Sequence, residues 1–157
     1  SSPGASPSVS VSPSASPSPL VSIPAEARQQ TPEGAVAFVK FYFDQVNRAW
    51  TEPSDSLLPS HADQTCGTCA NYQETAKGLV DNVQRLKSPS LILRDVVAKP
   101  GAPEGQQFLS STLHQEAAEV IDSSGNVIQV LEVKDRPTEM TAIWKDGRWW
   151  MYAIARA

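Results

Sequence analysis

The sequence predicts an α+β domain in which N-terminal helices pack on a curved antiparallel sheet of four to five strands. Apolar residues recur every three or four positions between residues 31 and 86, which is the period of an amphipathic helix. Beyond residue 90 the apolar period falls to about two, which is the period of a strand. Short turns join these strands, so consecutive strands should pair antiparallel as a meander. A long twisted sheet with helices on one face is expected to curl into a cone with a cavity at its open end.

Residues 1–23 precede this domain and have the composition of a tether. They contain ten Ser, five Pro and no charged residue, which is too little apolar bulk to offset the entropy lost on folding. We expect a disordered stalk here and a folded domain over residues 24–157. A chain that opens on such a stalk without Met is typical of a protein whose signal peptide has been removed, so we expect export and a lost N-terminal lipid anchor. A linker left by proteolysis is the alternative.

The charge pattern argues against one class of partner. Thirteen Lys and Arg against 17 Asp and Glu leave a net charge of −4, and the basic residues do not cluster, so we do not expect nucleic acid as a partner. The longest apolar runs, such as AVAFV and MYAIA, are far shorter than the roughly 20 residues of a membrane-spanning helix. Membrane contact is therefore expected only through the anchor, on the extracellular side of the cell membrane or in the cell wall.

The first helix has a clear start. Thr31 has the residue type of an N-cap, Pro32 suits the first helical position, and Glu33 suits the positively polarised first turn. Its apolar stripe is formed by Val36, Val39, Phe43, Val46 and Trp50. We expect these side chains to build the core, because every amphipathic helix needs such a stripe.

A loop with one helical turn at 54–58 should follow, and then a second helix from Cys66 or Cys69 to Leu86. The expected strands are Leu91–Ala98, Phe108–Ile121, Val127–Val133, Glu139–Lys145 and Arg148–Ala155. Asp146 and Gly147 separate the last two strands and predict a tight hairpin turn.

Both cysteines of the chain lie in the stretch HADQTCGTCANY, at Cys66 and Cys69. A thioredoxin-type redox centre, with Cys66 as the attacking thiol, would need a buried strand before the motif, and the preceding PSHADQ is polar. A zinc site would have to use His61 and His114 as well, with no ligand to spare. We favour a disulfide that clips the entry to the second helix, because two cysteines in an exported protein should oxidise together. The redox and zinc alternatives remain open.

The order of elements, the first helix TPEGAVAFVKFYFDQVN and the terminal hairpin AIWKDGRWWMYAI resemble the nuclear-transport-factor-2-like (cystatin-like) superfamily. With the stalk and the CGTC pair, the chain is similar to an uncharacterised family of actinobacterial secreted lipoproteins. The resemblance covers roughly residues 24–157. It implies a cone-like fold that serves isomerases, dehydratases and polyketide cyclases as well as catalytically silent binding domains.

Enzymes of that superfamily place an Asp, His or Tyr inside the cone. The corresponding residue types here are Asp44, Tyr42, His61 and His114. Asp44 is expected to be solvated at the helix edge, and His114 alternates with Thr112 and Glu116 on a polar strand face. No Asp–His pair occurs at helix or strand spacing, so the partner that would orient a general base is not visible in the sequence. We therefore predict no catalytic residue, no metal and no cofactor.

The last strand is apolar on both of its faces, so both must be covered. A curled sheet edge with the preceding loop could cover the second face, and a homodimer through the sheet is the alternative. A pocket, if present, should be bounded by Tyr42, Phe43, Trp50, Tyr72, Trp144 and Trp150.

Together these observations predict an exported, lipid-anchored, non-catalytic binding or protein-interaction module. Its ligand would be a hydrophobic small molecule or a cell-envelope protein. The alternative is a small isomerase-like or dehydratase-like enzyme that acts on a hydrophobic substrate in the cone cavity. A buried, paired Asp or His in the cavity would favour the enzyme, and a cavity with apolar walls would favour the module.

Overall fold

The structure, a computed structural model, describes residues 23–157. The predicted stalk lies outside the described residues, except for Ile23. That side chain is only 2 % exposed and belongs to the core, so the folded part begins at least one residue earlier than the predicted boundary. None of the described helices is long and apolar enough to cross a membrane.

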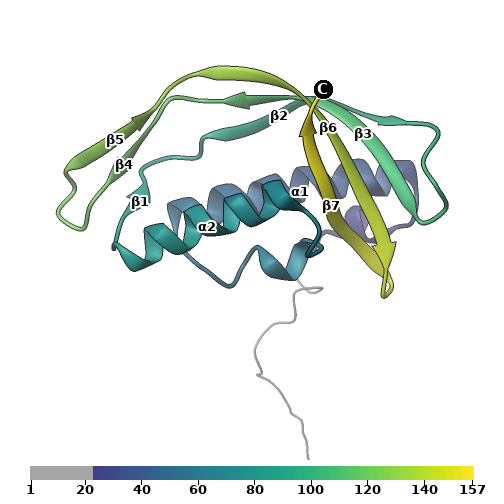
Figure 1. The fold of residues 1–157 in the computed structure, drawn as a ribbon, viewed down its shortest axis with the longest axis horizontal. Coiled ribbons are helices and arrows are strands. Elements are labelled where there is room, and N and C mark those ends of the chain that lie inside the picture. Colours follow the sequence, from purple (N-terminus) through teal and green to yellow (C-terminus); the bar gives the residue numbers. More distant parts are fainter. Residues whose placement is uncertain (1–22) are drawn as a thin grey trace, which may run out of the picture.

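Two α-helices lie beneath an arch of antiparallel strands, so the predicted α+β class is confirmed (Figure 1). Helix α1 spans Pro32–Thr51 and begins as predicted, because the Thr31 hydroxyl accepts a hydrogen bond of 2.9 Å from the backbone N–H of Gly34. A short 3-10 helix, η2 (Ala25–Arg28), packs against α1. A Cβ at Gly34 would overlap the backbone carbonyl oxygen of Gln29, so this close approach requires glycine.

Helix α2 spans Gly67–Asp81 and ends five residues before the predicted Leu86. It ends there because Val83 adopts a left-handed backbone conformation with φ of 54°, after which Arg85–Leu86 form the short strand β1. The helical turn predicted at 54–58 is also absent from the described loop. A 3-10 helix, η3, instead forms at Pro59–His61, where Pro59 occupies the first position.

The strands form two sheets rather than the single predicted meander. One contains β2 (Leu91–Lys99), β3 (Gln106–Gln115), β6 (Lys134–Lys145) and β7 (Arg148–Arg156), in that order. The other contains β1, β4 (Ala118–Ile121) and β5 (Val127–Leu131), in the order β1-β4-β5. The predicted strand Phe108–Ile121 is thus interrupted after Gln115, and β3 pairs with β6 instead of β5.

The interruption of the strands has a physical cause. One long hairpin runs through both sheets, and its two strands are interrupted opposite each other, at residues 116–117 and 132–133. The hairpin bends at this interruption and passes from the first sheet into the second. At the bend Glu116 bonds to Ser90 instead of to a strand: its N–H donates to the Ser90 carbonyl at 2.7 Å, and its carbonyl accepts from the Ser90 hydroxyl at 2.8 Å. This bend gives the arch its shape (Figure 1).

The terminal hairpin turns at Asp146 and Gly147 as predicted, with φ of 55° and 76°. Trp149 and Met151 of β7 point into the core and are 3 % and 0 % exposed. The outer edge of β7 is covered by the loop before α2, because the N–H of Asp63 donates to the Met151 carbonyl at 2.8 Å. The preceding loop therefore covers the edge of this strand, while the cover of its second apolar face stays a prediction.

Candidate functional site

A cleft of about 390 Å³ opens between α2 and the inner face of the β1-β4-β5 sheet. It lies where the strand bend lifts the sheet away from the helix. Its walls come from the end of α1, from α2 and from strands β1, β3, β4 and β5. The lining residues are Trp50, Thr75, Gly78, Leu79, Asn82, Gln84, Leu86, Gln115, Val120, Gln129 and Leu131.

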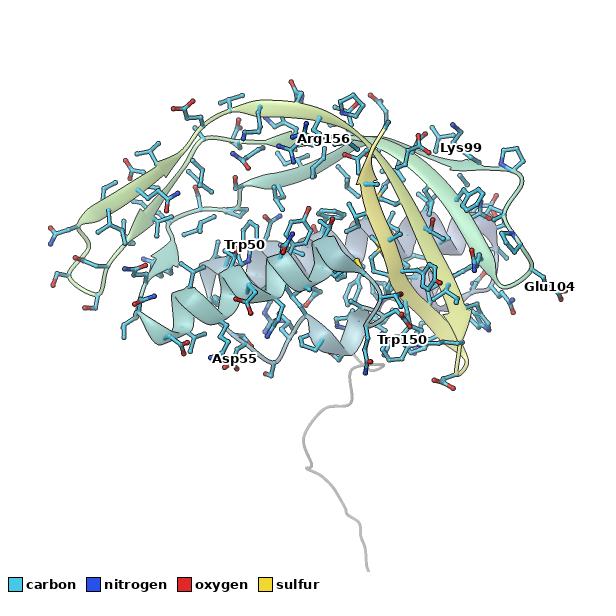
Figure 2. The ribbon with its side chains drawn as sticks, viewed as in Figure 1. Trp50, Asp55, Lys99, Glu104, Trp150 and Arg156 are labelled. Carbon is cyan, nitrogen blue, oxygen red and sulfur yellow. A yellow bond between two sulfur atoms is a disulfide. The ribbon has the colours of Figure 1, made fainter. Side chains whose placement is uncertain are left out.

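Trp50 forms the aromatic wall of the cleft, and its position is visible beneath the arch in Figure 2. The indole N–H donates to the backbone carbonyl of Tyr72 at 3.2 Å, and the two rings meet edge to face with centroids 5.7 Å apart. These contacts fix the indole between α1 and α2. Because its N–H is already bonded, the ring offers the cleft an apolar surface.

The early end of α2 creates the opposite wall. The left-handed turn at Val83 places Gln84 and Leu86 in an extended segment, where Leu86 pairs with Val120 of β4. Leu86 is only 2 % exposed and forms the apolar part of this wall. A helix continued to Leu86, as the sequence predicted, would have removed this wall.

The cleft carries amides in place of ionisable groups. Among the described residues that line it, the polar side chains are those of Thr75, Asn82, Gln84, Gln115 and Gln129, and the remaining residues are apolar or glycine. A more open hollow of about 600 Å³ adjoins the cleft at Leu79 and Gln84 and reaches the tip of the β4–β5 hairpin. The smaller cleft has the dimensions and mixed lining that small-molecule sites require.

The residues considered for acid–base chemistry lie outside the cleft. Asp44 is exposed on α1, and partial burial raises its pKa above the usual value. Tyr42 is 0 % exposed, and burial, with a smaller contribution from Tyr72, raises its pKa. The Tyr42 hydroxyl has no hydrogen-bond partner among residues 23–157. The side chain therefore acts as a core residue, in contact with Phe43.

His61 is held as a neutral acceptor in the core. It is 1 % exposed, packs edge to face on Phe41 with ring centroids 5.0 Å apart, and Nδ1 lies 3.1 Å from the donor Nη2 of Arg148. Burial, together with the charge of Arg148, lowers the pKa of His61 to about 4. The Arg148 guanidinium also lies 4.1 Å from the centroid of the Trp150 ring.

His114 is more buried than a residue on the predicted polar strand face, and it has the acidic partner that spacing in the sequence did not reveal. It is only 6 % exposed, and it does have a partner, because Nδ1 lies 2.6 Å from the Asp135 carboxylate. Nε2 lies 3.1 Å from the Glu116 carboxylate, and these two hydrogen bonds, Asp135 first, raise the pKa of His114. Neighbouring Gln115 lines the cleft, so His114 points to the opposite face of the sheet. The sequence did not reveal the His114–Asp135 pair, because the two residues are 21 positions apart and meet only through the register of β3 with β6.

The six aromatic residues predicted to bound one pocket do not gather around a single pocket. Figure 2 shows Trp50 and Trp150 far apart in the molecule. Trp144 packs edge to face on Trp149, with centroids 5.2 Å apart, near the terminal hairpin. Tyr42, Phe43 and Tyr72 join Trp50 in a chain of edge-to-face contacts between the helices. Trp50 alone of the six lines the cleft.

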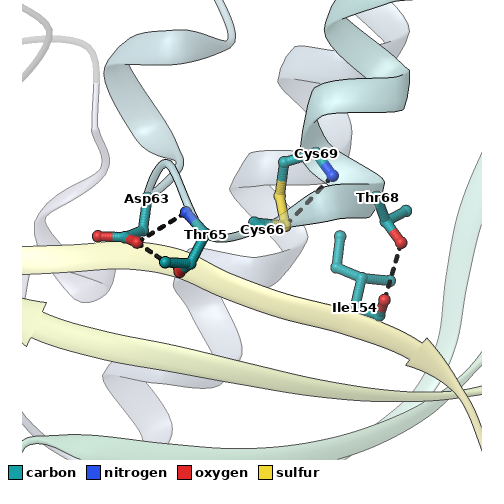
Figure 3. Close-up of a disulfide and its surroundings, with 6 residues drawn as sticks. All are labelled: Asp63, Thr65, Cys66, Thr68, Cys69 and Ile154. Carbon is teal, nitrogen blue, oxygen red and sulfur yellow. Dashed lines mark hydrogen bonds between the residues drawn. A yellow bond between two sulfur atoms is a disulfide. The ribbon is translucent and has the colours of Figure 1, made fainter.

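The sulfur atoms of Cys66 and Cys69 lie 2.02 Å apart, at disulfide-bonding distance (Figure 3). Cys66 is the N-cap of α2, and its sulfur accepts the N–H of Cys69 at 3.2 Å. The Thr68 hydroxyl donates to the Ile154 carbonyl at 2.8 Å and ties this helix end to β7. Both cysteines are at most 4 % exposed, which suits a structural clip better than thiol exchange.

The zinc set considered from the sequence is not assembled. His61 faces Arg148 and His114 faces two carboxylates, while the sulfurs face each other. Among residues 23–157 no three His, Cys, Asp or Glu side chains are grouped so that they could hold a metal.

Two α-helices beneath bent antiparallel sheets define an α+β domain. The chain is similar to the intermembrane space region of the chloroplast protein ARC6, with 13 % identity, a TM-score of 0.60 and coverage of 82 % of this chain and 97 % of that one. It is also similar to Aln2 from a Streptomyces species, with 15 % identity, a TM-score of 0.49 and coverage of 80 % and 92 %. An uncharacterised protein with a cystatin-like fold from Caulobacter vibrioides has 11 % identity, a TM-score of 0.45 and coverage of 76 % and 87 %.

The chain belongs to DUF6318, a family of unknown function whose model matches residues 12–155. No curated protein matches the chain. The predicted α+β class and the predicted membership of an uncharacterised family are thus confirmed, while the actinobacterial lipoprotein origin stays a prediction.

Proposed function

We propose that this protein is an exported, lipid-anchored module that binds a hydrophobic small molecule in the cleft between α2 and the β1-β4-β5 sheet. The supporting observation is the cleft itself. It has a volume of about 390 Å³ and an indole wall, and its described lining contains amides and aliphatic side chains without an acid or base. Such a lining can bind and orient a ligand through shape and hydrogen bonds.

Catalysis of the isomerase or dehydratase type would need an acid or base within hydrogen-bond reach of the substrate. His61, the most strongly perturbed histidine, is only 1 % exposed and is occupied by Arg148. The His114–Asp135 pair has the composition of a general-base dyad, but it lies on the other face of the sheet from the cleft. The geometry therefore favours binding over chemistry at this site.

The proposal of export and anchoring has separate support. The Ser- and Pro-rich composition of residues 1–23 suits a tether. The Cys66–Cys69 pair, placed at disulfide-bonding distance, suits an oxidising compartment.

Binding can be tested by NMR on the ¹⁵N-labelled chain with neutral aromatic fragments such as 2-methoxynaphthalene. Because the Trp50 indole forms one wall, its side-chain N–H signal should shift as the fragment saturates the cleft. Thr75→Trp would place a large side chain at the cleft and should abolish that shift. Glu74→Trp is the matched control, because Glu74 is exposed on the same helix and does not line the cleft. No shift at Trp50, or equal loss in both variants, would refute the proposed site.

Location can be tested in the cells that make the protein. An antibody against residues 24–157 should detect it in the membrane fraction, and trypsin added to intact cells should degrade it. Recovery of the protein in the cytosolic fraction, protected from trypsin, would overturn the proposal of export without affecting the binding experiment.

A further inference from the structure

The amides of the cleft carry information about the chemistry of its ligand. The side-chain nitrogen of Gln115 donates to the backbone carbonyl of Glu132 at 2.7 Å. The side-chain nitrogen of Asn82 likewise donates to the carbonyl of Gly78 at 2.8 Å. Both carbonyls lie where regular structure ends, at the strand bend and in the last turn of α2. Each amide is therefore anchored through its nitrogen.

Anchoring the nitrogen fixes the direction of the amide oxygen, which lies on the other side of the amide carbon. The oxygens of Gln115 and Asn82 accept no hydrogen bond from any described residue of the chain, residues 23–157. The Trp50 N–H, the donor of the apolar wall, is also occupied, by Tyr72. The amide oxygens of Gln115 and Asn82 are thus free acceptors at the cleft, and a ligand with hydroxyl or N–H donors would match them.

The cleft also disfavours charge. None of the described lining residues is ionisable, so an anion or cation that left water for this site would find no counter-ion, which is costly. Trp50, Leu79 and Leu86 offer apolar surface to a ring or an aliphatic body.

We propose that the ligand is an uncharged molecule with an apolar ring body and at least one hydroxyl or N–H group, which donates to the amide oxygen of Gln115. This inference rests on the proposed binding function of the same cleft.

Three probes with the same naphthalene ring separate the effect of a hydrogen-bond donor from the effect of charge. 2-Naphthol carries a donor, 2-methoxynaphthalene carries none, and 2-naphthoate carries a negative charge. Titrations of the full chain should be followed by NMR at the Trp50 indole N–H. We expect 2-naphthol to bind about three- to tenfold more tightly than 2-methoxynaphthalene, the ratio that one hydrogen bond supplies. 2-Naphthoate should bind at least about tenfold more weakly than 2-naphthol.

Gln115→Leu should lower the ratio of the affinities for 2-naphthol and 2-methoxynaphthalene to about one. Gln107→Leu is the matched control, because Gln107 lies on the same strand, donates to the Lys99 carbonyl at 2.8 Å and does not line the cleft. This control should keep the preference for 2-naphthol.

Equal affinities for 2-naphthol and 2-methoxynaphthalene, or tighter binding of 2-naphthoate, would overturn the ligand class while the binding function stands. Absence of any shift at Trp50 with all three probes would overturn both. The probe comparison uses the unaltered chain, so it decides the question even if Gln115→Leu does not fold.

Discussion

Mild acid should destabilise this protein through His61. The side chain is 1 % exposed and accepts a hydrogen bond from the Arg148 guanidinium, so it must stay neutral in the folded state. Protonation would remove the acceptor and place a second positive charge beside Arg148 in the core. Burial and Arg148 accordingly hold the folded-state pKa at about 4, against 6.5 for an unperturbed histidine.

The sign and size of the effect follow from linkage. A group whose pKa is lower in the folded state is protonated first in the unfolded state, so the free energy of unfolding falls as pH drops below 6.5. Each pKa unit is worth about 1.4 kcal/mol, so the full loss is about 3 kcal/mol once the pH is below 4. At pH 4.5 about 2.5 kcal/mol should already be lost, which corresponds to roughly 10 °C in Tm for a domain of this size.

The assay is urea unfolding of the chain and of His61→Gln at pH 7.5 and pH 4.5, followed by circular dichroism. Glutamine keeps an acceptor for Arg148 and does not titrate, so this variant should lose about 2.5 kcal/mol less than the unaltered chain between the two pH values. Other groups titrate in this range, but they are common to both chains. Parallel losses of stability in the two chains would show that His61 is not kept neutral by its surroundings.

Three further substitutions and the Cys66–Cys69 pair have expected effects on stability or mass. Gly34→Ala should destabilise the fold by about 2 kcal/mol in urea unfolding, because a Cβ there overlaps a backbone carbonyl oxygen. Gly78→Ala, at a helical site with open space around its Cβ, should stabilise it by about 0.5–1 kcal/mol. Tyr42→Phe should raise the free energy of unfolding by up to about 1 kcal/mol, because it removes a buried hydroxyl that has no partner among the described residues. The chain should be two protons lighter by intact mass than its fully reduced form, should hold no zinc, and should lose about 2 kcal/mol when the Cys66–Cys69 bond is reduced.

Each of these predictions has an outcome that contradicts it. Equal effects of the two glycine substitutions would mean that the carbonyl oxygen of Gln29 does not approach Gly34 as described. Destabilisation by Tyr42→Phe would reveal a partner of the hydroxyl. Two alkylatable thiols, or stoichiometric zinc, would reopen the CGTC stretch as a chemical centre.

Features that depend on near neighbours in the chain were predictable from the sequence. Thr31 and Pro32 identify the start of α1 because a cap acts within one turn. Asp146 and Gly147 identify the hairpin because both adopt positive φ, which the favoured two-residue turn requires. The change of apolar period likewise separated helices from strands, because burial on one face imposes it locally.

Features that depend on distant residues were not predictable in this way. The His114–Asp135 pair exists only through the register of β3 with β6. His61 and Arg148 are 87 positions apart and meet because the loop before α2 runs along the edge of β7. Spacing rules for helices and strands cannot detect either pair, so the sequence suggested isolated histidines.

The cleft combines two such departures from local expectation. Val83, a β-branched residue, adopts a left-handed conformation that sequence rules assign to glycine, and this ends α2 early. Glu116 pairs with Ser90 instead of continuing its ladder, and this bends the hairpin away from the helices. The left-handed conformation of Val83 costs local stability. Together the two departures open the space that Trp50 and Gln115 line. Under the proposed function, these two positions are where ligand binding would constrain the fold.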